Sequence, residues 1–308
     1  SGTDLALLYD TQNYLNRNGL IRRNSHHIAR LISLEGIAGA ISAVLASLLM
    51  LWSLHWVIVI QAIIGIAPVL IALTLAEPPR DISLASHREN AAQIKVAILE
   101  KPLVLSIALA LIAFNLAAIY GFWLYQKYWE VRGVPLVYFG YLWAIHCVIR
   151  SAAARFANEI EAWLGSRNTL ILVAATNVLG LAGMALAPGL IGVYVALILP
   201  LSRGISSVIL YDGLNKRLGA TFRATVNSLV NLGFRSVFII TGPLLGLLVD
   251  QRGVDASLLL LAAIFTPVFS LVLVMLFRNI HQEQSESRKA APLNGEAAAP
   301  EAKSSITH

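Results

Sequence analysis

Asn227, Asn231 and Arg235 follow one another at intervals of four residues inside a long apolar run of this chain. In an α-helix this spacing places the three side chains on one face. Arg235 lies about 16 Å from the start of the run, because each helical residue adds about 1.5 Å. A guanidinium holds carboxylate and phosphate groups through paired hydrogen bonds. This face could therefore bind an anionic solute.

Further polar side chains inside other apolar runs are candidates for the walls of the same cavity. They are Arg203, Asn115, Tyr120 and His146. Glu35 is the one acid well inside such a run, so Glu35 and His146 are candidates for carrying a coupling proton. Simpler roles are open as well. Arg203 could clamp neighbouring helices, His146 could be a core histidine, and Glu35 could pair with a nearby basic residue. Arg150, near the end of its run, could extend to the lipid headgroups.

The elements that must position these residues are apolar and long. Hydrophobic residues make up 57% of the 308 and charged residues 13%, whereas a soluble domain has about 25% charged residues. A helix needs about 20 residues to cross about 30 Å of hydrocarbon. Eight segments qualify, at 29–52, 55–77, 102–126, 134–154, 168–187, 189–211, 224–249 and 255–277. The alternation typical of barrel strands is absent, so the sequence predicts an all-α polytopic membrane protein with eight transmembrane helices.

The basic residues predict how the chain is oriented. When the loops are numbered along the chain from the first residue, the odd-numbered loops carry seventeen lysines and arginines and the even-numbered loops carry three. Cytoplasmic loops carry the excess of positive charge, so we expect both ends of this chain to be cytoplasmic, in the cell membrane. The net charge of +6 is scattered between apolar runs, so we expect no nucleic-acid partner. The single cysteine, Cys147, leaves no intrachain disulfide.

Two segments, one between the apolar runs and one after them, are too polar to cross the membrane. Residues 78–101 form a central loop in which 84–100 resemble an amphipathic helix on the cytoplasmic interface. A solvated linker helix is the alternative for the same residues. Residues 279–308 are rich in Ala, Ser, Glu and Gln, which predicts a disordered cytoplasmic tail.

Three stretches carry a resemblance to a known family. They are "SGTDLALLYDTQNYLNRNG" at 1–19, "LAEPPR" at 75–80 and "RATVNSLVNLGFRSVFIITGPLLGLLVDQRG" at 223–253. Gly246, Asp250 and Gly253 keep a G-x-x-x-D-x-x-G spacing. In order and spacing these stretches resemble the major facilitator superfamily over residues 1–278. The loop 155–167 departs from the family pattern, because Ala162 and Trp163 stand where the family usually has an acid and a base. We therefore assign no gating role to that loop.

The resemblance implies that the eight runs are helices 5 to 12 of a twelve-helix transporter, with four helices missing from the front. Residues 1–28 would hold the cytoplasmic end of helix 4 and a loop, 29–77 the last two helices of an N-terminal bundle, and 102–278 a six-helix C-terminal bundle. The third and sixth helices of each bundle are expected on the outside, here 55–77, 168–187 and 255–277. These three runs carry no charge beyond their ends, as expected if charges avoid lipid.

The resemblance implies a secondary active transporter that moves a small solute by alternating access. The arginines favour an anionic solute, and a proton gradient could drive transport. A G-x-x-x-x-G-K-[ST] run is absent from the sequence, so we expect no ATP drive in this chain. We expect no enzyme activity, cofactor or metal, and a monomer in the lipid bilayer. The alternatives are a membrane-embedded lipid-modifying enzyme and a non-transporting scaffold or sensor.

Overall fold

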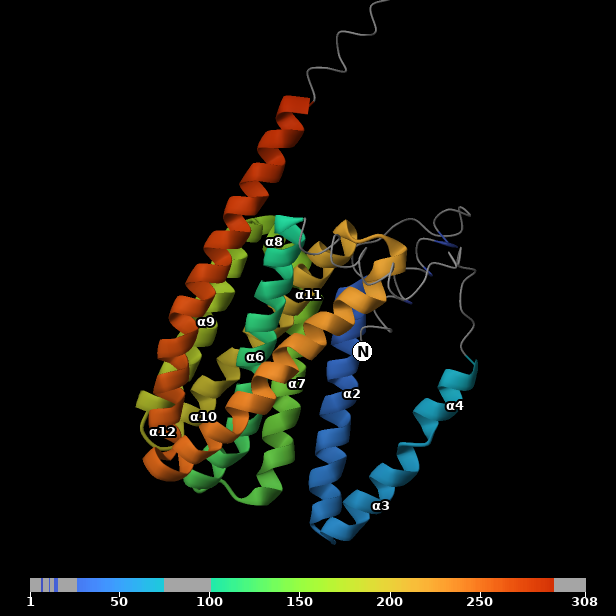
Figure 1. Cartoon of the computed structure of the whole chain (residues 1–308). Coiled ribbons are helices and arrows are strands. Elements are labelled where there is room, and N and C mark those ends of the chain that lie inside the picture. Colours follow the sequence, from blue (N-terminus) through green and yellow to red (C-terminus); the bar gives the residue numbers. More distant parts are fainter. Residues whose placement is uncertain (1–6, 8–10, 12–13, 16–26, 75–100, 291–308) are drawn as a thin grey trace, which may run out of the picture.

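The computed structural model describes residues 7, 11, 14–15, 27–74 and 101–290, and the regular elements among these residues are all helices (Figure 1). In chain order they are α2 (His27–Met50), α3 (Leu54–Ile64), α4 (Ala67–Thr74), α6 (Pro102–Val131), η1 (Leu136–Tyr138), α7 (Phe139–Arg155), α8 (Ala157–Leu164), α9 (Ser166–Leu186), α10 (Ile191–Val195), η2 (Ala196–Ile198), α11 (Leu199–Arg217) and α12 (Ala220–Ala290). The predicted all-α fold is confirmed.

Seven segments of the described chain are long and apolar enough to cross a membrane. The last of them, Phe222–Glu286, has 65 residues. As one straight helix it would be about 98 Å long, far more than the about 30 Å of a bilayer core. Its backbone leaves helical geometry at Gly253, where φ is 82°, a conformation that glycine adopts easily. Figure 1 shows the chain reversing its direction there, so α12 has a first arm up to Arg252 and a second arm from Val254. The two arms and the six other segments account for the eight predicted spans, so the chain is a multi-pass membrane protein.

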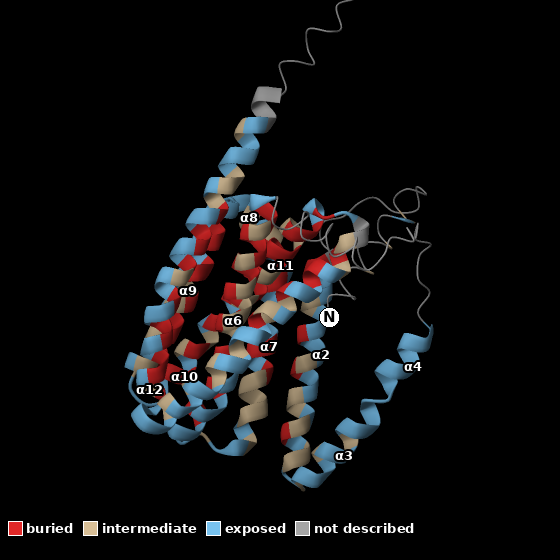
Figure 2. Cartoon of the chain, viewed as in Figure 1, coloured by how far each residue is buried: buried red, intermediate tan, exposed pale blue. Residues whose placement is uncertain are grey.

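Two of the spans are broken helices. The first is split at Gly65 into α3 and α4. The second begins as α10 and passes through η2 into α11, where Pro200 occupies the first turn, a position that tolerates the missing N–H group. Neither α3 nor α4 contains a buried residue. Figures 1 and 2 show these two helices apart from the bundle that α6 to α12 form.

The core of that bundle is built around α6. This helix packs against α12, α11 and α9, and its Tyr128 and Trp129 are among the largest fully buried side chains. The Tyr128 hydroxyl donates to Met184 O at 2.7 Å and thereby joins the end of α6 to α9. Phe114 of α6 stacks on Phe269 of the second arm of α12, with ring centroids 4.5 Å apart. Buried residues accordingly gather on the inner faces of these helices (Figure 2).

α2 joins the bundle through α7, and small residues line the contact. We call this contact the α2–α7 seam, formed by Gly36, Gly39, Ala43 and Ser47 on α2 and by Gly140, Ala144, Cys147 and Ser151 on α7. A Cβ atom at Gly36 would collide with Ser151, and one at Gly140 would collide with Ser47 and with the Ala43 carbonyl. The Ser151 hydroxyl also donates to Ser33 O at 2.9 Å. Small side chains let membrane helices approach closely, so the seam holds α2 tightly against α7.

The C-terminal end of α12 differs from the sequence prediction. We predicted disorder from residue 279, but the helix continues to Ala290. Three contacts hold this extension against α6 and α11: Asn279 Nδ2 donates to Pro102 O at 3.0 Å and to Ser106 Oγ at 3.2 Å, and Arg217 pairs with Glu283 at 3.2 Å. The predicted interfacial helix at 84–100 and most of 1–28 lie outside the described residues, as does the tail at 291–308.

Candidate functional site

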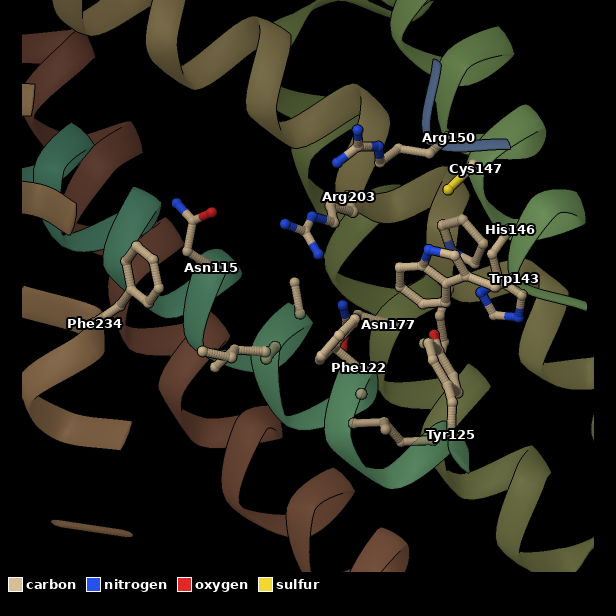
Figure 3. A pocket seen from close by; sticks show the side chains of 18 of the residues that line it. Asn115, Phe122, Tyr125, Trp143, His146, Cys147, Arg150, Asn177, Arg203 and Phe234 are labelled. Atoms are coloured by element: carbon tan, nitrogen blue, oxygen red, sulfur yellow. The ribbon is translucent and has the colours of Figure 1, made fainter. Parts of the chain in front are cut away.

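A cavity of about 420 Å³ opens between the helices at the level of the seam (Figure 3). Its lining comes from α2, α6, α7, α9, α11 and the first arm of α12. Residues far apart in the sequence therefore meet at one place, as expected of a ligand site in a helical membrane protein.

Arg150 lines this cavity, and so do five of the eight candidate binding or coupling residues. They are Glu35, Asn115, His146, Arg203 and Arg235. Three others have different surroundings: Tyr120, Asn227 and Asn231 are not among the lining residues. The Tyr120 hydroxyl contacts the Thr241 hydroxyl, and its ring packs against Phe238 at 5.5 Å between centroids. Of the three residues that the helical spacing put on one face, Arg235 lines the cavity, whereas Asn227 and Asn231 do not.

One wall of the cavity is charged. Arg150 Nη2 lies 3.5 Å from Glu35 Oε1, so an ion pair links α7 to α2 across the seam. Arg150 therefore faces a carboxylate, in place of the headgroup contact that we weighed for it. Arg203 lies within electrostatic range of both groups, and no carboxylate among the described residues is within ion-pair distance of it. Arg235 also lines the cavity, but its side chain is exposed. The described lining holds three arginines against one glutamate, so its net charge is positive.

One end of the cavity is aromatic. Trp143 and His146 of α7 lie nearly parallel, with ring centroids 5.9 Å apart. The Tyr125 ring meets the His146 ring at 4.4 Å, and the Phe122 ring meets the Trp143 ring at 5.0 Å. Figure 3 shows Arg203 between Asn115 on one side and this aromatic group on the other. The cavity thus combines a cationic wall with flat apolar surface.

Two buried polar side chains of the lining have unpaired atoms. His146 is 4% exposed and Asn177 is 5% exposed. Among the described residues, His146 Nε2 and Asn177 Oδ1 have no hydrogen-bond partner, although Asn177 Nδ2 donates to Ser202 Oγ at 3.3 Å. An unpaired buried polar atom costs about 1–3 kcal/mol, and such atoms in native proteins call for an explanation.

Sequence reasoning missed Asn177, Phe122 and Trp143. Asn177 lies on α9, the run 168–187 that we expected on the outside of the bundle, yet its side chain is in the cavity. Phe122 and Trp143 are apolar residues in apolar runs, so nothing in the sequence separates them from residues that face lipid. The one available signal was Asn177 itself, an amide in the middle of a span.

Asn227 pairs with another amide inside the bundle. Asn227 Nδ2 donates to Asn215 Oδ1 at 2.8 Å, and Asn215 Nδ2 reaches Asn227 Oδ1 at 3.4 Å. Both residues are fully buried. Asn215 Nδ2 also donates to Tyr211 O at 2.8 Å, and Arg223 Nε donates to Asn215 O at 3.1 Å. These contacts join α11 to the first arm of α12 and supply a structural role for Asn227.

Replacing Asn227 by leucine is expected to lower the free energy of unfolding by about 1–3 kcal/mol, because Asn215 Oδ1 would stay buried without this donor. The double variant Asn215→Leu/Asn227→Leu should recover part of the loss, since both amides are then replaced by apolar groups. Asn168→Leu is the matched control, because Asn168 is exposed and its side chain donates to Leu164 O, at the end of α8, at 3.0 Å. Denaturant titration in detergent micelles measures these differences. Unchanged stability together with lost solute binding would instead make Asn227 a binding residue.

The chain matches the model of a known protein family. The family model described as Major Facilitator Superfamily matches residues 22–235, which run from before α2 into the first arm of α12. The matched range covers more than half of the chain and includes every residue that lines the cavity. No curated protein matches the chain.

Proposed function

The chain belongs to the major facilitator superfamily of membrane transporters, and from that premise we propose that its cavity binds the transported solute of a secondary active transporter. The observation that carries the proposal is the meeting of Arg150, Arg203 and Arg235 in one membrane-embedded cavity. A charge inside the membrane costs several kcal/mol. Glu35 offsets the charge of Arg150, and a bound anion would offset the positive charge that remains on the lining.

The charge of the lining supports a small anionic solute. Arg203 has no carboxylate partner among the described residues, so its paired N–H groups are available to a carboxylate or a similar group. A volume of about 420 Å³ suits a small organic molecule. The protein would lie in the lipid bilayer. All the lining residues come from one chain, which supports a monomer as the transporting unit.

Alternating access would work across the α2–α7 seam. α2 belongs to the segment before the central loop and α7 to the segment after it, so the Glu35–Arg150 pair joins the two halves of the chain. Rocking of the halves about a central site would break and remake this pair. The excess of lysine and arginine in one set of loops supports a cell-membrane protein whose ends are cytoplasmic.

Solute flux into proteoliposomes without ATP tests the proposal. Purified protein is reconstituted, and a panel of labelled organic anions is offered with and without a pH gradient. Saturable uptake of at least one anion above that of empty liposomes is the expected result. If no member of a broad solute panel enters under any gradient, a scaffold or an enzyme takes the place of a transporter.

Replacing Glu35 by glutamine is expected to uncouple transport from the proton gradient. Protonation of Glu35 would release Arg150, and an amide cannot make that change. Accumulation driven by an imposed pH gradient should fall at least tenfold, while exchange of labelled for unlabelled solute should persist. Glu130→Gln is the matched control, since Glu130 forms an exposed ion pair with Lys127 away from the cavity. Full gradient-driven accumulation in the Glu35→Gln protein would remove Glu35 from the coupling step.

A further inference from the structure

We infer that the aromatic end of the cavity is a subsite for the ring of an aromatic acid that carries a hydroxyl or N–H group. The inference rests on the proposed function and names the class of solute. Its basis is the combination of Arg203, the aromatic rings and the unpaired Asn177 oxygen in one cavity.

The rings supply a flat binding surface. Phe122 and Trp143 are only half-buried and both line the cavity, so part of their ring surface faces its interior. Trp143 and His146 are nearly parallel, with an interplanar angle of 12°. A planar ligand can lie against such a surface with offset stacking or edge-to-face contacts, which favour aromatic over saturated rings of the same size.

The charged wall fixes the orientation of the ring. Arg203 lies between the aromatic group and Asn115 (Figure 3), and its neighbours within electrostatic range include Tyr125 on the aromatic side. A carboxylate held by Arg203 would therefore direct an attached ring toward Tyr125, Trp143 and His146. A cavity of about 420 Å³ has room for a small aromatic acid.

The unpaired atoms define what the ring should carry. Asn177 Oδ1 is an acceptor and needs an O–H or N–H donor, and its own Nδ2 is already bonded to Ser202. His146 Nε2 can donate or accept, depending on its tautomer. A ring hydroxyl can donate to Asn177 Oδ1, and a hydroxyl or N–H group that reaches His146 Nε2 can pair that nitrogen. A bare hydrocarbon ring would leave them unpaired.

Equilibrium binding of four probes to the full chain in lipid nanodiscs tests this subsite. The probes are 4-hydroxybenzoate, benzoate, cyclohexanecarboxylate and benzyl alcohol. We expect 4-hydroxybenzoate to bind about tenfold more tightly than benzoate, because the hydroxyl pairs buried groups. Benzoate should bind about fivefold more tightly than cyclohexanecarboxylate, and the neutral alcohol should bind most weakly.

The variant Asn177→Leu identifies the residue that recognises the hydroxyl. It should abolish the preference for 4-hydroxybenzoate over benzoate, and a thermal unfolding transition measured alongside shows that the variant is folded. Thr176→Val is the matched control on the same helix, since the Thr176 hydroxyl donates to Leu172 O of its own helix. A hydroxyl preference that survives Asn177→Leu would overturn the role of Asn177.

Failure of the subsite is distinguishable from failure of the proposed function. Equal binding of benzoate and cyclohexanecarboxylate would overturn the aromatic subsite and leave an anion site in place. Proteoliposomes that take up another solute while none of the three acids binds would also overturn the subsite and keep the transporter. Absence of uptake for a whole solute panel would overturn the proposed function itself.

Discussion

Replacing Arg203 by alanine is expected to weaken binding of benzoate about 100-fold and to reduce its uptake accordingly. Two charge-assisted hydrogen bonds to a carboxylate are together worth about 3 kcal/mol at about 1.5 kcal/mol each, which corresponds to about two orders of magnitude in Kd. Arg203→Lys should recover part of the affinity, because an ammonium keeps the charge and loses the paired geometry. Equilibrium binding in nanodiscs measures both values.

Two other arginines make this prediction specific. Arg235→Ala should weaken benzoate binding by about tenfold or less. The Arg235 side chain is exposed, so water competes with the ligand for its N–H groups. Arg155→Ala should leave binding unchanged, since Arg155 forms a surface pair with Glu159 at 3.7 Å and does not line the cavity. If Arg235→Ala had the larger effect, the anion would bind near the first arm of α12 and not at Arg203.

The sequence predicted the charged part of this site better than its other parts. A charge in a membrane span is costly, so Arg203, Arg235 and Glu35 stand out in the sequence even before their neighbours are known. The energetic cost of a charge in the membrane does not reveal which residue it pairs with. The sequence left open what Glu35 contacts, and the structure shows Arg150 at 3.5 Å. The aromatic end could not be found in this way, because Phe122 and Trp143 cost nothing in an apolar span.

Helical spacing predicted faces but not what the faces meet. Asn227, Asn231 and Arg235 share one stripe, yet Asn227 is paired with Asn215 while Arg235 lines the cavity. A helix of this length passes several neighbours along one face, so different parts of one stripe have different surroundings. Asn177 shows the converse, since α9 as a whole was expected on the outside of the bundle, yet two of its residues, Asn177 and Leu181, line the cavity.

The limits of the spans were predicted least well. The run 102–126 continues as α6 to Val131, and α12 continues to Ala290. Apolar length locates the membrane-crossing part of a helix, but polar turns beyond the membrane are set by tertiary contacts such as Arg217–Glu283 and Asn279–Pro102. Gly253 shows the opposite case: a single glycine with φ 82° ends one arm and starts the next without an intervening loop.

The α2–α7 seam offers a direct test of movement between the halves of the chain. Gly39 and Cys147 both line the cavity and face each other in the middle of the seam. A Cβ atom at Gly39 would lie 3.3 Å from the Cys147 sulfur, with no other atom within 4 Å. The two Cβ atoms of a disulfide are about 3.5–4.5 Å apart, so a Cβ atom this close to the Cys147 sulfur is within reach of a crosslink. The native Cys147 is the single cysteine of the sequence, so one substitution is enough to create a crosslink.

Replacing Gly39 by cysteine is therefore expected to give a protein that an oxidant crosslinks and inactivates. Uptake should fall at least tenfold after oxidation and recover on reduction, because a disulfide between α2 and α7 prevents the change of contact that alternating access requires. Gly39→Ser tests the added side chain without a crosslink, and Gly39→Cys/Cys147→Ala tests oxidation without a second thiol. Mass analysis of the oxidised protein establishes how much is crosslinked. A fully crosslinked protein with undiminished uptake would show that α2 and α7 stay together during transport, and the moving parts would then have to lie elsewhere in the bundle.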